Sequence, residues 1–318
     1  MRYRDHPSVP PDFSWSEYLR LNPSLAKKGY TSEPLAYRHW VKIGCKAGLR
    51  YKESQELPLP PPPPPREAPR EEDLKIGVVI ATYMRDDGKT PQLLKRALDS
   101  VFRQTFQNFK VFLIGDYYEN SEEFQSICSS YDSSKLWSIN LPFAFERDRY
   151  DRHDTQMLVW NYAGAFANNY GIDQAMLQGY EYVCHLDHDD FWEKDHLSQV
   201  QACILSTGAL WVCTKSTYPF PKGQAMPSVG GDEFYIEYPP QARKVVHSSV
   251  CMNYRKIPLR HRNVYEETGK VDLPGDADYW ERVGKWMKRN KEKGYLINKV
   301  TCRKEEEGFE RTRFKRRI

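Results

Sequence analysis

The amino-acid sequence predicts an α/β protein: a mixed, mostly parallel central sheet flanked by helices, preceded by a small α-helical module. Short apolar runs rich in β-branched residues, at Lys75–Thr82 and Phe109–Asp116, are typical of buried strands. Thr90 and Pro91 open a helical pattern between them. Strand, helix and strand within about 40 residues form a βαβ unit, whose strands are parallel.

The N-terminal residues 1–52 are predicted to form the small helical module. Ser14 is expected to cap a helix that ends at Leu21. A second helix is expected over Pro34–Ile43, stopping at Gly44, with a buried side formed by Leu35, Trp40 and Ile43.

A proline-rich linker, residues 53–73, separates this module from the sheet domain. Six consecutive prolines begin at Pro60 and favour a stiff polyproline II spacer. We expect the α/β domain at residues 74–310 and a solvated basic tail at 311–318.

Composition and charge exclude several classes of protein. The net charge of +4 is small for 318 residues and does not indicate a nucleic-acid partner. The start "MRYRDHPSVPPDF" has no apolar signal region, and no run of about 18 apolar residues predicts a transmembrane segment. Seven scattered cysteines without a C-x-x-C pair favour reduced thiols. We therefore expect a cytoplasmic protein.

A cluster of acidic residues follows a further predicted strand. A helix over Tyr162–Leu177 precedes the apolar run "YEYVCHL", which ends in "DHDD". Open α/β sheets bind ligands beyond the carboxyl ends of their strands, so this cluster lies where a ligand site is expected. The segment "ATYMRDDGKT" after the first strand has a single glycine, which argues against a dinucleotide or P-loop phosphate cradle there.

The acidic cluster has three readings. Asp187 and Asp189 form a D-x-D whose carboxylates point the same way and can hold Mg²⁺ or Mn²⁺. Alternatively, Asp189 or Asp190 caps a helix that begins near Glu193. A third reading joins His185 and His188 to the carboxylates as the mixed metal site of a phosphohydrolase. The residues alone leave all three open.

Longer motifs resemble family 2 glycosyltransferases. The segments "IGVVIATYMR", "LLKRALDSVFRQTFQNFKVFLIGD", "NYAGAFANNYGIDQAMLQGYEYVCHLDHDDFW" and "GDADYWERV" come in that family's order over about residues 75–305. The resemblance implies a GT-A-type fold and inverting transfer of a sugar from a nucleoside diphosphate, of which UDP is the one expected, to a glycan or glycoprotein. It also implies a divalent cation, Mn²⁺ or Mg²⁺.

The resemblance implies roles for particular residues. Ala81, Thr82 and Tyr83 would line the pocket for the nucleotide base, and Asp116 would accept a hydrogen bond from the base imide. Asp116 also reads as an ordinary turn residue. The remaining residues implied at the donor are Asn161, Asn169, Asp187 and His188, with Asp187 and Asp189 as metal ligands.

The same likeness implies a catalytic base. Asp276 matches the second position of the family's Glu-Asp pair, while Gly275 replaces the glutamate. Asp276 or Asp278 also reads as a helix cap. The family's late metal-binding histidine is missing from "VTCRKEEEGFERTRF", where Glu305 is a weak substitute.

The departures from the family pattern leave a rival function open. Gly275 at the base and the missing late histidine are compatible with a non-catalytic module that binds sugar nucleotides or glycans.

The N-terminal module resembles short modules beside glycosyltransferases of bacteria and large DNA viruses. This resemblance implies docking to other glycan-assembly proteins, and location in the host cytoplasm if the chain is viral.

Overall fold

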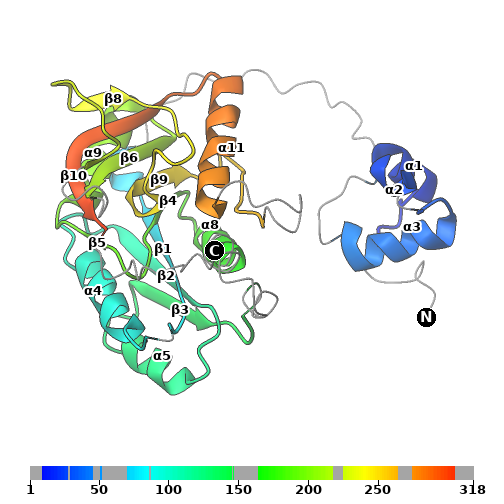
Figure 1. The fold of residues 1–318 in the computed structure, drawn as a ribbon, viewed down its shortest axis with the longest axis horizontal. Helices are drawn as coiled ribbons and strands as arrows, with labels where there is room; N and C mark the ends of the chain where they lie inside the picture. Colours follow the sequence, from blue (N-terminus) through cyan, green and yellow to red (C-terminus); the bar gives the residue numbers. More distant parts are fainter. Residues whose placement is uncertain are drawn as a thin grey trace, which may run out of the picture. The chain divides into compact units, whose positions relative to one another are not determined.

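The computed structural model describes residues 9–27, 29–45, 51, 70–85, 87–144, 146, 164–217, 225–263 and 274–304. The chain divides into two compact units, Met1–Arg66 and Glu67–Ile318 (Figure 1).

The first unit is a small helical module around an aromatic core. Its helices are α1 (Trp15–Leu21), α2 (Ser24–Lys27) and α3 (Glu33–His39), which continues as a π-helical turn, Trp40–Gly44. Ser14 caps α1 as predicted, because its hydroxyl accepts from the Glu17 backbone N–H at 3.4 Å. The expectation that Ile43 faces the core is wrong, since its exposed fraction is 49%. Trp40 is buried as predicted, but the wider π-helical turn breaks the α-helical period, and the residues buried with it are Ala36, Tyr37 and His39.

The second unit contains a ten-stranded mixed sheet. The strand order is β3-β2-β1-β4-β9-β6-β10-β5, with β7 paired to β6 and β8 paired to β10. The strands are β1 (Ile76–Thr82), β2 (Phe109–Gly115), β3 (Leu136–Asn140), β4 (Tyr182–His185), β5 (Phe191–Trp192), β6 (Trp211–Thr217), β7 (Ala225–Met226), β8 (Tyr235–Glu237), β9 (Val250–Asn253) and β10 (Gly294–Arg303).

The directions of the strands determine which residues meet. The predicted βαβ unit is present, and β3, β2, β1 and β4 are parallel. The short strand β9 runs antiparallel to both β4 and β6, and β10 runs parallel to β6. The carboxyl ends of β1, β2, β4, β6 and β10 therefore lie along one edge of the sheet.

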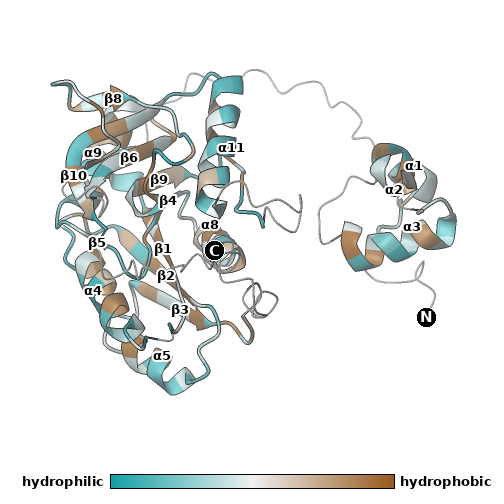
Figure 2. Ribbon diagram, viewed as in Figure 1, coloured by the Kyte–Doolittle hydropathy of each residue, from teal (hydrophilic) through white to brown (hydrophobic). Residues whose placement is uncertain are grey.

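Helices cover both faces of this sheet. They are α4 (Thr90–Phe102), α5 (Ser121–Cys128), α8 (Ala165–Leu177), α9 (His196–Thr207) and α11 (Gly275–Arg289). Alternate residues of β1 face opposite layers: Val78 packs in the core with α4, α5 and α9, and Val79 in the core with α8 and α11. Figure 2 shows brown, hydrophobic residues along the central strands and teal on the outward turns of α11.

Glycine permits the close approach of α8 to the sheet. A Cβ atom added at Gly171 would lie 2.7 Å from Cγ1 of Val79, so no larger side chain fits there without a shift.

The cysteines are free thiols, as predicted, and all except the exposed Cys45 are buried. Within the described ranges, no helix is both long and apolar enough to cross a membrane.

Candidate active site

The candidate site lies at the sheet edge formed by the parallel carboxyl ends. Tyr83 follows β1, Asp116 follows β2, and Asp187 lies two residues beyond the end of β4. The Leu186 backbone N–H donates to the Val79 carbonyl at 3.1 Å, which continues the β1–β4 register to the point where the acidic turn begins.

Three carboxylates converge in this turn. Each of Asp187, Asp189 and Asp190 offers one oxygen, and the three oxygens lie within 4.8 Å of one another. Ser248 organises the turn: its hydroxyl donates to Asp190 Oδ2 at 2.5 Å and accepts from the Asp187 backbone N–H at 3.0 Å. Arg96 donates to the Asp189 carbonyl at 2.9 Å.

The helix-cap reading of this turn is wrong. The next helix, α9, begins at His196, and Asp195 occupies its N-cap position. Asp190 instead ends the turn before β5 and is 1% exposed. Its burial beside two other carboxylates requires compensation by a cation.

Two basic side chains provide that compensation. Lys304 Nζ lies 3.5 Å from Asp187 Oδ2 and 3.2 Å from Asp190 Oδ2. Arg85 Nη1 lies 3.6 Å from Asp189 Oδ2. Sequence reasoning missed both. The available signal for Lys304 was its position directly after the last strand, but only the direction of β10 brings it to this edge.

The electrostatics differ between two of the carboxylates. Burial raises the pKa of Asp190 to about 7, against the charge of Lys304, and the other two carboxylates add to the rise. Burial also opposes ionisation of Asp187, but the charge of Lys304, followed by those of His247 and His188, outweighs it and lowers the pKa. Asp187 is therefore the better anionic ligand at neutral pH.

The acidic turn has the donor set that a hard divalent cation prefers, because carboxylate oxygens bind Mg²⁺ and Mn²⁺. The side chains of Asp187 and Asp189 are 40% and 17% exposed, so an ion and a phosphate can reach them. The predicted substitute ligand Glu305 lies outside the described residues.

The residues predicted for the nucleotide base adjoin this turn. The His188 imidazole lies against the backbone of Ala81, and its ring meets that of Tyr83 edge-on, with 5.5 Å between the ring centroids. Thr82 Oγ1 and the Tyr118 hydroxyl are 2.6 Å apart, and the Asp116 backbone N–H donates to the Thr82 carbonyl at 2.7 Å. Asp116, which follows β2, is 3% exposed. It is thus held beside the end of β1.

The structure describes only one of the two asparagines that were predicted to flank the donor. Asn161 lies outside the described residues. Asn169, on α8, exchanges two hydrogen bonds with the His261 backbone, at 2.8 and 2.9 Å, so it anchors the loop that carries His261. Its role at the donor stays a prediction.

The two candidate bases on α11 differ in environment. Asp276 is exposed in the first turn of the helix, where its Oδ1 accepts from the Ala277 backbone N–H at 2.7 Å. Asp278 is 7% exposed and accepts from Arg262 at 2.8 Å and Arg282 at 2.7 Å. Asp278 is therefore held in a structural ion-pair network, and Asp276 is the carboxylate that an acceptor can reach.

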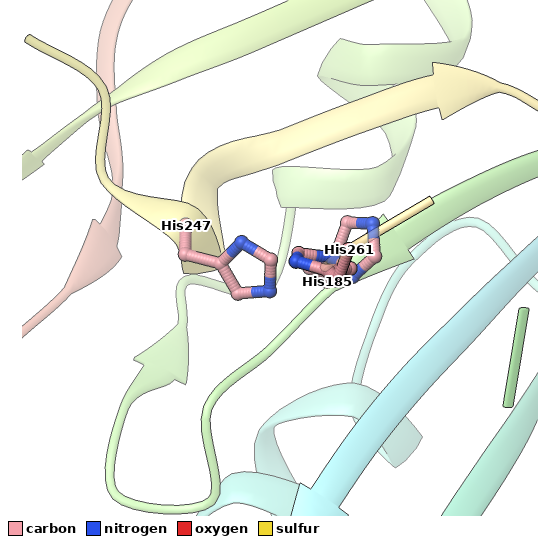
Figure 3. Close-up of side chains that lie close together, drawn as sticks. All are labelled: His185, His247 and His261. Atoms are coloured by element: carbon pink, nitrogen blue, oxygen red, sulfur yellow. The ribbon is translucent and has the colours of Figure 1, made fainter. Parts of the chain in front are cut away.

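The two histidines of the acidic segment, His185 and His188, lie in different surroundings. His188 stays with Ala81 and Tyr83, whereas His185 groups with two distant imidazoles, His247 and His261 (Figure 3). The mixed His/Asp site of a phosphohydrolase is thus not assembled among the residues described.

Comparisons with known proteins identify relatives. The family description "Glycosyl transferase family 2" matches residues 77–269. An uncharacterized glycosyltransferase of Acanthamoeba polyphaga mimivirus is 35% identical over 242 residues, which are 74% of this chain and 96% of that protein. The amylovoran biosynthesis glycosyltransferase AmsB of Erwinia amylovora is 32% identical over 127 residues, 40% of this chain and 35% of that protein.

A solved structure shares the fold. It is S. aureus TarS 1–349 in complex with UDP-GlcNAc, with a TM-score of 0.51 and 15% identity. The match covers 73% of this chain and 58% of that chain. The predicted GT-A-type fold is confirmed.

Proposed function

Because the chain belongs to glycosyltransferase family 2 and is a glycosyltransferase, we propose that it is an inverting, metal-dependent enzyme. Its donor is a nucleoside diphosphate sugar, uridine-linked, and its acceptor is a hydroxyl of a glycan or glycoprotein. The observation that carries this proposal is the convergence of three carboxylates, with Lys304 and Arg85, at the sheet edge beside Asp116 and Tyr83.

The nucleotide would bind across the ends of β1 and β2. The half-exposed ring of Tyr83 offers a stacking surface, and Asp116 offers a fixed acceptor for the imide N–H of uracil. Ala81, Thr82 and His188 hold this wall in place through the contacts described above. The UDP-GlcNAc bound by TarS, which shares the fold, supports a uridine-type donor.

The diphosphate would lie over the acidic turn. Asp187 and Asp189 would hold Mn²⁺ or Mg²⁺, which neutralises the charge of the leaving diphosphate. Lys304 and Arg85 place two further positive charges at the same edge, where they orient the phosphates and offset the carboxylates. Asn161 and Asn169 are proposed to flank the donor.

Asp276 would act as the base. The acceptor hydroxyl oxygen bonds to the anomeric carbon, the bond from that carbon to the diphosphate oxygen breaks, and Asp276 takes the hydroxyl proton. Attack on the face opposite the leaving group inverts the anomeric centre. Exposure of Asp276 on the first turn of α11 leaves it open to an acceptor.

The remaining expectations are proposals as well. Residues 1–52 would dock to other glycan-assembly proteins, with residues 53–73 as linker, 74–310 as the catalytic domain and 311–318 as a basic tail. Transfer would take place in the cytoplasm.

Calorimetric titration tests the donor site. UDP and GDP are each titrated with and without Mn²⁺ into the wild type, Asp189→Asn, and the control Asp195→Asn, whose carboxylate pairs with Lys299 instead. We expect Mn²⁺-dependent binding of UDP that Asp189→Asn loses and Asp195→Asn keeps. Equal binding of UDP without metal would refute metal dependence, and binding of neither nucleotide would refute the donor site.

A further inference from the structure

Three buried imidazoles form a cluster that the transfer reaction does not use. His185 ends β4, His247 begins a 3-10 turn (His247–Ser249), and His261 lies in the loop held by Asn169. Their exposed fractions are 0%, 7% and 9%. Figure 3 shows the three rings gathered at one point, although 76 residues of sequence separate the first from the last.

The three rings are close enough for their nitrogen atoms to share one ion. The ring centroids of His185 and His247 are 4.4 Å apart, and His261 lies 5.7 and 5.3 Å from them at steep angles. One nitrogen from each ring lies within 4.8 Å of the other two. Nitrogens around a tetrahedral zinc ion lie about 3.3 Å apart, given bonds of about 2.0–2.1 Å, so small side-chain adjustments close the site.

Each ring also has a buried nitrogen without a hydrogen bond. Across the described part of the chain, His185 Nδ1, His247 Nδ1 and His261 Nε2 contact no hydrogen-bond partner. Buried polar atoms are nearly always satisfied, and three orphans in one cluster require an explanation. A shared metal ion would satisfy all three together.

The second ring nitrogen of His185, Nε2, already has a hydrogen-bond partner. Its Nε2 lies 2.5 Å from the Tyr254 hydroxyl, which is 3.0 Å from the Tyr279 hydroxyl. A proton on Nε2 donated to Tyr254 leaves the Nδ1 lone pair directed at the cluster. Metal-binding histidines characteristically use their second nitrogen in this way.

The positive side chains near the cluster are compensated by partners of their own. Arg260 pairs with Asp173, and Arg282 pairs with Asp278.

We propose that His185, His247 and His261 bind one zinc-class transition metal ion, distinct from the cation at the acidic turn. Three imidazoles without a carboxylate select Zn²⁺ or Co²⁺ over Mg²⁺ or Mn²⁺. The ion would be a positioning element, because His247 immediately precedes Ser248, which holds both Asp187 and Asp190.

Cobalt substitution tests the site without measuring transfer. The full chain is stripped with a chelator, loaded with Co²⁺, desalted and analysed for bound metal and visible absorption. The variants are His247→Gln and His261→Gln. Two controls are His196→Gln, a buried histidine stacked on Trp192 outside the cluster, and Asp189→Asn, which disables the acidic turn.

We expect the wild type and both controls to retain about one equivalent of Co²⁺, with the intense visible bands of a four-coordinate site in which three ligands are imidazole nitrogens. Each cluster variant should lose at least nine-tenths of it. In the wild type and both controls, but in neither cluster variant, Zn²⁺ should raise the melting temperature. A folded wild type that retains no metal overturns the proposal, as does retention by both cluster variants or loss in Asp189→Asn.

Discussion

Replacing Lys304 by methionine tests whether an internal cation neutralises the acidic turn. The change removes the ammonium group beside Asp187 and Asp190 but keeps a long apolar side chain. The control is Lys299→Met in β10, the strand that Lys304 follows; the partner of Lys299 is Asp195, and its side chain is 44% exposed.

The magnitude follows from the distances. At 3.2 Å and an effective dielectric of about 20, the attraction between Lys304 and Asp190 is about 5 kcal/mol. Breaking a buried pair costs about 3–5 kcal/mol. Asp190 can take up a proton and Asp187 can be hydrated, so we expect a loss of about 2–3 kcal/mol. The exposed control pair should lose about 0.2–1 kcal/mol.

Urea unfolding in the presence of EDTA gives both free energies of unfolding at pH 7.5. Saturating Mn²⁺ should narrow the gap between Lys304→Met and the wild type, because the ion replaces the missing charge. The reasoning fails if the two lysine variants lose the same stability in EDTA, or if Lys304→Met loses less than about 0.5 kcal/mol.

Three further predictions concern the base, an ion-pair network and the packing of α8. Asp276→Asn should lower the transfer rate by about 10²–10⁴-fold while UDP affinity, measured by calorimetry, stays within twofold; an unchanged rate would require another base. Burial opposes ionisation of Asp278, but the hydrogen bonds from Arg262 and Arg282 outweigh it and lower the pKa of this carboxyl group in the folded chain. The ionised carboxylate therefore stabilises the folded chain fully above its pKa in the unfolded chain, about 3.9, and this stabilisation is lost as the pH falls through the lower pKa of the folded chain. Asp278→Asn should therefore destabilise the chain in urea unfolding at pH 7 by more than at pH 3.5, and an equal loss at both values would contradict this. Gly171→Ala should lower stability by about 1–3 kcal/mol, because the new methyl group meets β1; no loss by thermal unfolding would show that α8 can move.

The sequence was most informative where one rule of topology sufficed. Asp116 and Asp187 follow strands that a βαβ pattern makes parallel, so their shared edge could be predicted. Lys304 could not be placed in this way. It joins the site because β9 inserts antiparallel between β4 and β6, which reverses the chain direction twice and leaves β10 pointing to the same edge.

The same limit explains the histidines. Sequence proximity grouped His185 with the carboxylates, but this last residue of β4 is buried against Trp280 of α11 and Tyr254, which follows β9. Its partners, His247 and His261, come from segments with no periodic relation to it. Contacts across such separations depend on tertiary packing, which the local pattern of one sequence does not encode.

Because the ammonium group of Lys304 offsets the charge of the acidic turn, folding of this turn does not depend on metal binding. In small zinc domains the ion supplies folding free energy, and the chain without metal stays unfolded. Here the lysine belongs to the polypeptide itself, so the acidic turn can close during folding without a metal ion. Under the metal dependence proposed above, folding of the chain and its loading with metal are independent steps, and metal supply would set how much enzyme is active without changing how much is folded.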